Sequence, residues 1–252
     1  METCIKIAED RDFEILKELI DFHEGWSLDY NKENIKVWSK SDDESKSSCK
    51  MLKMHTVFPD VTAAILFDVL HDPEYRKVWD THMQESFDIG YLNPNNDIGY
   101  YSIKCPPPLK NRDFILQRSW LDIGTEMLIL NHSVEHKDFP PKKGFVRATS
   151  LLTGFVIRPE GSGCFFGYIS QTDPHGKIPL WVVNKCTQIF GPKLVKTIHT
   201  AAQGYVQWKE KQVNPCYKPW IYPEQMTAPR ISISDCVPDK SVDKTKGSPR
   251  HK

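Results

Sequence analysis

The chain has 252 residues, a formal net charge of +0 and 26% charged residues, which indicates no global field for nucleic acid or for an acidic surface. No stretch approaches the roughly 18 consecutive apolar residues of a membrane-spanning helix. The first dozen residues are acidic and lack the apolar core of a signal peptide, so we expect a cytoplasmic protein.

The seven cysteines are scattered along the chain and form no C-x-x-C pair. In a cytosolic chain this pattern predicts free thiols, and the missing ligand spacing argues against a zinc site. We therefore expect no metal and no cofactor. The cysteines are Cys4, Cys49, Cys105, Cys164, Cys186, Cys216 and Cys236.

The N-terminal third predicts a helix, three strands and two short helices. Apolar residues recur with helical spacing over 12–23, and a second helical pattern follows Asp60, which can serve as its N-cap. Asp72 and Pro73 suit an N-cap and a first helical position, so another short helix should begin there. The strand-like runs are 26–30, 34–39 and 49–58.

The rest of the chain predicts an antiparallel meander followed by a long helix. The meander strands are 83–92, 98–105, 112–121, 127–136, 145–158 and 164–172. The helix covers 178–211, with a kink expected at Gly191 and Pro192. The composition of 225–252 is typical of a disordered polar tail.

This order of elements indicates an α+β fold with a curved, antiparallel, nine-stranded sheet. Six consecutive strands without intervening helices argue against a doubly wound parallel sheet. The last helix is amphipathic and can bury its apolar face only against the concave side of the sheet. Such packing tends to leave a pocket between helix and sheet.

Catalytic and metal-binding motifs find little support. No G-x-S-x-G elbow or phosphate-binding loop is present, and Gly161-Ser162-Gly163 is typical of a hairpin turn. His132 and His136 are four residues apart, but they lie in a predicted strand, where two ordinary histidines are expected. A Cys–His nucleophile remains as a minor alternative.

Two charged motifs each allow two interpretations. Arg76 and Asp80, four apart on the short helix, form either a surface ion pair or a partly buried site in which Arg76 binds an anion. Arg112 and Asp113 allow the same two interpretations, and for them we favour structural ion pairs.

Three segments resemble the StAR-related lipid transfer (START) family, and within it the phosphatidylcholine transfer protein subgroup. They are 72–80 (DPEYRKVWD), 105–113 (CPPPLKNRD) and 177–184 (KIPLWVVN), in the family's order. The resemblance covers 10–224, the expected lipid-binding domain. It implies a helix-grip fold, in which the sheet surrounds a lipid tunnel closed by the C-terminal helix.

The resemblance also implies functional residues. Arg76 stands at the family's contact to the lipid phosphate. Tyr101, Phe114 and Leu151 stand at the positions of an aromatic cage for choline, so this chain retains two of its three aromatic residues. A weaker cage implies that phosphatidylethanolamine is accepted besides phosphatidylcholine. The expected lid and membrane contacts are Pro106, Pro107, Pro108, Leu109, Phe190 and Leu194.

The function that the resemblance implies is non-enzymatic. We expect a monomeric phospholipid transfer protein that binds one glycerophospholipid and touches membranes transiently and peripherally. The alternatives are a lipid-gated sensor or adaptor and an enzyme with the tunnel as active site. Basic residues of the long helix allow either contact with an anionic leaflet or a solvated face. They are Lys185, Lys193, Lys196, Lys209 and Lys211.

Overall fold

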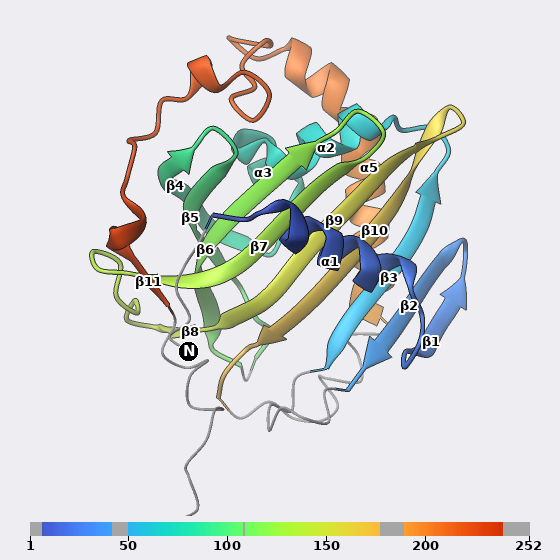
Figure 1. Cartoon of the computed structure of the whole chain (residues 1–252), viewed down its shortest axis with the longest axis horizontal. Helices are drawn as coiled ribbons and strands as arrows, with labels where there is room; N and C mark the ends of the chain where they lie inside the picture. The colour runs from blue at the N-terminus through green and yellow to red at the C-terminus, as the bar shows by residue number, and fades with distance from the viewer. Residues whose placement is uncertain (1–6, 42–49, 108, 177–188, 239–252) are drawn as a thin grey trace, which may run out of the picture.

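The computed structural model describes residues 7–41, 50–107, 109–176 and 189–238, and one large sheet dominates it (Figure 1). The helices are α1 (Asp10–Asp21), α2 (Ala63–His71), α3 (Pro73–Trp79) and α5 (Gly191–Glu210), with 3₁₀ turns η2 (Pro223–Gln225) and η3 (Ile233–Asp235). The strands are β1 (Ser27–Lys32), β2 (Ile35–Lys40), β3 (Met51–Phe58), β4 (Met83–Asn93), β5 (Asn96–Ile103), β6 (Asn111–Asp122), β7 (Met127–His136), β8 (Phe145–Arg147), β9 (Thr149–Glu160), β10 (Gly163–Asp173) and β11 (Cys236–Pro238).

The main sheet has the strand order β1-β2-β3-β10-β9-β7-β6-β5-β4, with antiparallel pairing throughout. Two short strands lie off this path, β8 beside β6 and β11 beside β7. Register shifts in the β1–β2, β4–β5 and β9–β10 pairs add local twist. The expected α+β fold with a curved nine-stranded sheet and a C-terminal helix is confirmed.

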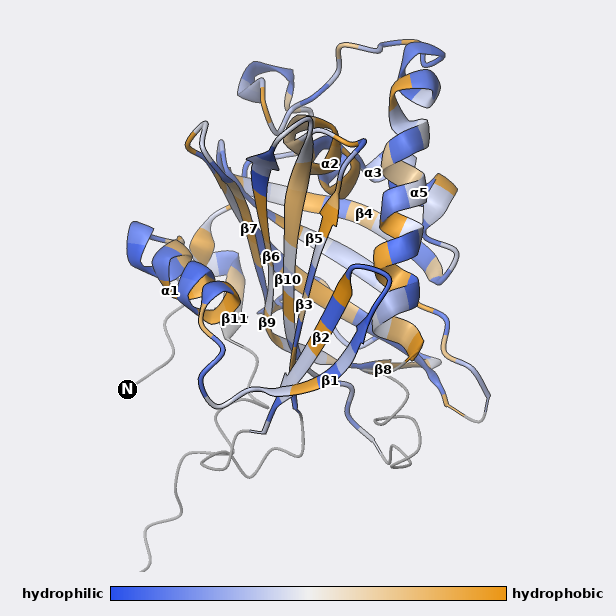
Figure 2. Cartoon of the chain, turned by 90° about the vertical axis from the view of Figure 1, so that its right-hand side faces the viewer, coloured by the Kyte–Doolittle hydropathy of each residue, from blue (hydrophilic) through white to orange (hydrophobic). Residues whose placement is uncertain are grey.

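Helices cover both faces of the sheet, as Figure 2 shows with α1 on one side and α2, α3 and α5 on the other. We call the face under α2, α3 and α5 the concave face and the opposite one the outer face. On the concave face, Phe67, Ile157 and Tyr205 belong to one buried cluster. On the outer face, Leu16 and Ile20 of α1 pack into a separate cluster. Because strand side chains alternate, neighbouring residues of β7 and β9 enter different cores: Ile129 and Ile157 the first, Leu128 and Val156 the second.

The α2–α3 junction follows local capping rules, with one change from the expected residues. Thr62, not Asp60, caps α2, and its hydroxyl accepts a hydrogen bond from the Ile65 amide at 3.4 Å. Asp72 caps α3 as expected, and its Oδ1 accepts hydrogen bonds from the amides of Glu74 (3.0 Å) and Tyr75 (3.1 Å). This cap fixes the start of the helix that carries Arg76.

Two expected elements have different boundaries. The strand expected over 145–158 is divided at Ala148, because β8 pairs parallel with β6 while β9 pairs with β7 and β10. The long helix expected over 178–211 is described from Gly191 onward as α5, and Phe190 before it already has helical dihedral angles (φ −70°, ψ −39°). Residues 177–188 lie outside the described part of the chain, and they include the first part of that expected helix and the third family-like segment.

The expectation of a disordered tail is wrong for residues 226–238, which we call the C-terminal strap. The Tyr91 amide of β4 donates to Pro229 O, the Ile231 amide donates to Tyr91 O, both at 3.0 Å, and β11 pairs with β7. Ile231 and Cys236 pack on an apolar cluster of the outer face. Composition alone missed these few apolar residues because their partners are distant in sequence. Residues 239–252 lie outside the described part.

Candidate functional site

Arg76 lies where α2, α3 and the concave face meet. Its Nη2 donates to Leu70 O at 3.3 Å, and its Nη1 lies 3.6 Å from Asp80 Oδ2. The second distance is longer than a hydrogen bond, so the ion pair is loose. The Arg76 side chain is 25% exposed and that of Asp80 12%. Arg76 is therefore partly desolvated and its guanidinium is incompletely engaged by these contacts.

Two aromatic rings flank this guanidinium. The Arg76 Cζ lies 5.1 Å from the ring centroid of Trp79 and 5.8 Å from that of Tyr101. Both separations are within the range of cation–π attraction. The Tyr101 hydroxyl donates to Asp80 Oδ2 at 2.6 Å, and burial raises the pKa of Tyr101, so the phenol stays protonated. Arg76, Asp80 and Tyr101 thus form one connected group.

Phe114 extends this group along the sheet. It is directly opposite Tyr101 in the β5–β6 register, and the two ring centroids are 6.4 Å apart. Leu151 lies on a different strand, at the irregularity where Ser150 pairs with Thr172 and Leu152 with Gln171. The structure therefore brings together Arg76, Tyr101 and Phe114, whereas Leu151 lies at a β-bulge of β9, a strand that β7 separates from β6 in the sheet.

A second charged pair on the concave face was missed by the sequence analysis. Arg118 Nε donates to Asp97 Oδ1 at 3.1 Å, and a further N–H of Arg118 contacts Asp97 Oδ2. Asp97 and Arg118 are opposite each other in the β5–β6 register, four residues from Tyr101 and Phe114 respectively. Burial raises the pKa of Asp97 even though Arg118 lies beside it. The sequence could have indicated this pair, because strand residues four apart point to the same face. Asp97 is four residues before Tyr101, and Arg118 is four residues after Phe114.

Arg112 and Asp113 differ from each other in their environment. Asp113 forms the expected structural ion pair, with Arg147 as its partner at 3.0 Å. Arg112 donates instead to three backbone carbonyls, those of Pro174 (3.0 Å), Lys110 (2.5 Å) and His175 (2.9 Å), so its expected ion pair is replaced by hydrogen bonds to a loop. Adjacent strand residues point to opposite faces, so Arg112 and Asp113 meet different partners.

The expected lid residues lie in the loop between β5 and β6 and at the start of α5. Pro106 and Pro107 are exposed, and Leu109 is half-buried in a turn closed by its amide and Pro106 O at 3.0 Å. Phe190 is 42% exposed, whereas Leu194 packs against the core. Lys193, Lys196 and Lys211 are exposed, but Lys209 is buried. Pro108 and Lys185 lie outside the described residues.

The described residues contain no group of three His, Cys, Asp or Glu side chains that could hold a metal ion. His132 and His136 both lie in β7, where four residues span about 13 Å, so the two side chains are too far apart to bind one metal ion. Cys105, Cys164, Cys216 and Cys236 are free thiols. No helix in the described part of the chain is both long and apolar enough to cross a bilayer.

Comparisons with known proteins agree with this geometry. The sequence profile of the START domain matches residues 6–209. START domain-containing protein 10 of Mus musculus is 42% identical over 232 residues, which cover 92% of this chain and 79% of that protein. Phosphatidylcholine transfer protein of Bos taurus is 29% identical over 187 residues, which cover 71% of this chain and 85% of that protein.

Solved structures give the same result. The crystal structure of human STARD10 superimposes with a TM-score of 0.89 at 40% identity, covering 94% of this chain and 96% of the other. Human StAR-related lipid transfer protein 5 has a TM-score of 0.67 at 18% identity, covering 79% of this chain and 94% of that chain, and shares the fold. The profile match and the 42% identity together show that this chain belongs to the START domain family.

Proposed function

We propose that this protein is a phospholipid transfer protein of the cytoplasm whose lipid-binding domain spans 10–224. It binds one glycerophospholipid in a tunnel between the concave face and α5, and exchanges it between membranes. The observation that carries the proposal is the position of Arg76, loosely paired with Asp80 and flanked by the rings of Trp79 and Tyr101. A planar guanidinium in such a place suits a phosphate, which it can hold with two parallel hydrogen bonds.

Tyr101, Phe114 and Leu151 make up the proposed head-group cage. Aromatic faces attract a quaternary ammonium by about 0.5–2 kcal/mol each. With an aliphatic side chain in the third position, the cage loses part of its preference for choline over a primary ammonium. The proposed ligands are therefore phosphatidylcholine and phosphatidylethanolamine, in line with the similarity to phosphatidylcholine transfer protein.

A tunnel is needed because acyl chains cross water poorly. Moving them from a bilayer into water costs about 0.8 kcal/mol per methylene. We propose that the lipid enters while the protein touches a membrane peripherally and transiently, as a monomer. The proposed contacts are Pro106, Pro107, Leu109, Phe190 and Leu194, of which Pro106, Pro107 and Phe190 are exposed.

Native mass spectrometry of the purified protein tests the binding step. We expect one phospholipid per chain, with both choline and ethanolamine head groups. Transfer of labelled phospholipid between vesicles then separates a carrier from a lipid-gated sensor, which binds lipid without transferring it. Chemical turnover of the phospholipid would identify an enzyme instead. A protein that binds no phospholipid under these conditions would contradict the proposal.

A further inference from the structure

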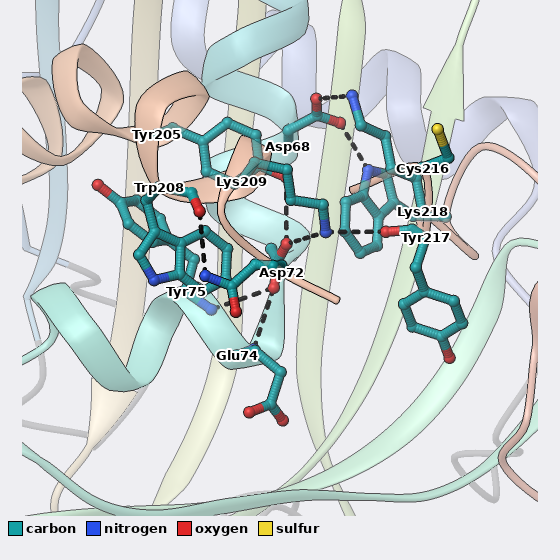
Figure 3. A network of polar contacts seen from close by, with 12 residues as sticks. Asp68, Asp72, Glu74, Tyr75, Tyr205, Trp208, Lys209, Cys216, Tyr217 and Lys218 are labelled. Atoms are coloured by element: carbon teal, nitrogen blue, oxygen red, sulfur yellow. Dashed lines mark hydrogen bonds and ion pairs between the residues drawn. The ribbon is translucent and has the colours of Figure 1, made fainter. Parts of the chain in front are cut away.

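Buried polar contacts hold the C-terminal half of α5, residues 201–210. Figure 3 shows the network, in which Lys209 Nζ donates to Asp72 Oδ2 at 2.7 Å and to Tyr217 O at 2.9 Å. The Tyr205 hydroxyl donates to Asp72 Oδ2 at 3.1 Å. Tyr75 of α3 adds a further bond, from its hydroxyl to Ala201 O at 2.7 Å. This half of α5 is therefore tied directly to α3.

The network is shielded from water and extends beyond the helix. Asp72 is 2% exposed and Lys209 9%. Burial raises the pKa of Tyr205, so its hydroxyl remains a donor. The segment after α5 is held by the neighbouring Asp68, which accepts from Lys218 Nζ at 2.6 Å and from Trp220 Nε1 at 2.8 Å. Breaking these contacts would leave buried charges unpaired, which is strongly unfavourable.

The N-terminal half of α5, residues 191–200, has polar contacts of a different kind. Lys196 pairs with Glu33 where the two side chains are 56% and 62% exposed. His199 contacts Asp60 at 2.6 Å, again at the surface. Exposed ion pairs are weak because water and salt screen them. Val195 and Ile198 are buried here, but apolar contacts impose no fixed direction.

A groove separates the helices at this weaker end. It has a volume of about 440 Å³ and lies between α3 and α5. Its lining includes Val78 and Trp79 of α3 and Lys193, Lys196 and Thr197 of α5. The two helices are thus in contact around Tyr75 and Ala201 and are divided by the groove toward Lys193, so α5 has space beside its N-terminal half.

We propose that Asp72 is a positioning residue that fixes the pivot of α5, so that the N-terminal half of the helix is the end that leaves the sheet. One carboxylate performs two tasks, since Oδ1 caps the helix carrying Arg76 and Oδ2 holds Lys209 and Tyr205. The helix can therefore open without displacing Arg76. The use of this motion to admit lipid rests on the proposed function, but the pivot itself does not.

Three variants separate the two tasks of Asp72. Asp72→Asn keeps a side-chain oxygen for the N-cap, a position that Asn suits well, but removes the charge that pairs with Lys209. Lys209→Met removes the other partner and leaves the cap untouched. Lys196→Met is the matched control on the same helix, because it breaks an exposed ion pair at the other end.

Hydrogen exchange of the lipid-free protein, read by mass spectrometry, tests the pivot. In the unmodified protein, amides 203–209 should exchange at least tenfold more slowly than amides 195–200. Asp72→Asn and Lys209→Met should accelerate exchange over 203–209 by about tenfold or more and leave β9 unchanged, whereas Lys196→Met should leave 203–209 unchanged. If the Asp72–Lys209 contact only stabilised the whole fold, both variants would also accelerate hydrogen exchange in β9. That result would overturn the proposal.

Vesicle transfer distinguishes failure of the pivot from failure of the proposed function. If the protein transfers phosphatidylcholine, Lys209→Met should change the transfer rate by more than about threefold while the co-purified phospholipid stays constant. If the protein transfers no phospholipid but shows unequal hydrogen exchange along α5, the proposed function is contradicted and the pivot is supported. Equal exchange protection at both ends of α5 would overturn the pivot whatever the transfer assay gives.

Discussion

The Arg147–Asp113 pair of the outer face and the Arg76–Asp80 pair of the concave face are built differently. On the outer face, Arg147 holds Asp113 through Nε (3.2 Å) and Nη2 (3.0 Å) and also donates to the carbonyls of Phe139 and Pro140. On the concave face, Arg76 lies 3.6 Å from Asp80 and shares that carboxylate with Tyr101. The guanidinium of Arg147 is fully engaged by acceptors of the protein, whereas that of Arg76 is not.

This difference distinguishes the structural role of Arg147 from the role that we propose for Arg76. Asp113 is completely buried, and the two-pronged contact of Arg147 offsets the desolvation of that carboxylate. Arg76 is partly desolvated by aromatic rings, and its contacts with Leu70 O and Asp80 leave donors of the guanidinium open, which suits it to an anion. The same residue types therefore form a closed structural pair in one case and, in the other, leave a guanidinium that suits the proposed phosphate contact.

Substitution of Arg76 should have the largest effect on function. Arg76→Met leaves a bound phosphate without its partner, a loss of roughly 3–5 kcal/mol. The affinity for phospholipid should fall more than about a hundredfold, at about 1.4 kcal/mol per decade. Arg76→Lys should recover part of it, because lysine keeps the charge but not the planar fork. Native mass spectrometry and vesicle transfer measure both.

Lys77→Met is the control for this experiment. Lys77 is the next residue of α3, is 51% exposed and pairs with Glu74 at the surface. Its removal should change stability by no more than about 0.5 kcal/mol and leave lipid content unchanged. Normal lipid content and normal transfer in Arg76→Met would contradict the proposal that Arg76 contacts the phosphate. Such a result would leave the description of the fold unchanged.

Arg147→Met should show the opposite pattern on the outer face. It leaves the buried Asp113 carboxylate unpaired and should lower the free energy of unfolding by about 3 kcal/mol or more. Denaturant titration measures this loss, and the affinity for phospholipid at a temperature where the variant is folded should stay within about twofold of the unmodified protein. A large loss of affinity in the folded variant would contradict the separation of the two faces.

Acid should weaken the fold through two poorly solvated histidines, the half-buried His55 and the buried His71. Burial lowers the pKa of His55 to about 4 and lowers that of His71 well below its usual range. Between pH 6.5 and 4 the unfolded chain binds a proton at His55 that the folded chain does not, so the free energy of unfolding falls as the pH falls. The effect of His55 amounts to at most about 3 kcal/mol.

His55→Phe tests this source of acid sensitivity. His55 packs edge-on against Trp38 and Phe165, so a phenyl ring suits the site. The variant should show a shallower decline of the unfolding free energy between pH 6.5 and 4 in denaturant titrations. An unchanged slope would assign the acid sensitivity to other groups.

Truncation should have the smallest of these effects. A chain ending at residue 225 loses Ile231 and Cys236 from the outer-face cluster, and we expect a loss of about 2 kcal/mol after the entropy of ordering the C-terminal strap is offset. A chain ending at residue 238 keeps the strap and serves as the control. Thermal unfolding compares the two, and equal midpoints would show that the strap contributes no stability.

The sequence alone determined the features that depend on neighbouring residues. Asp72 and Pro73 marked the start of α3 because a cap is a contact within one turn. Alternating apolar residues located the strands to within a few residues, and their order implied an antiparallel sheet with a helix on its concave face. Three family-like segments pointed to Arg76, which the fold places beside Tyr101 and Trp79.

Contacts between distant segments were decided only by the tertiary structure. From the sequence alone, Arg112 and Asp113 were interpreted together, but strand alternation directs Arg112 to a loop and Asp113 to Arg147. The polar composition of the C-terminal strap concealed the side chains that pack on the sheet. The link between Asp72 and Lys209 joins residues 137 positions apart. The physical reason is common to all three: burial and pairing depend on which surfaces meet, and that is set by the packing of the whole chain.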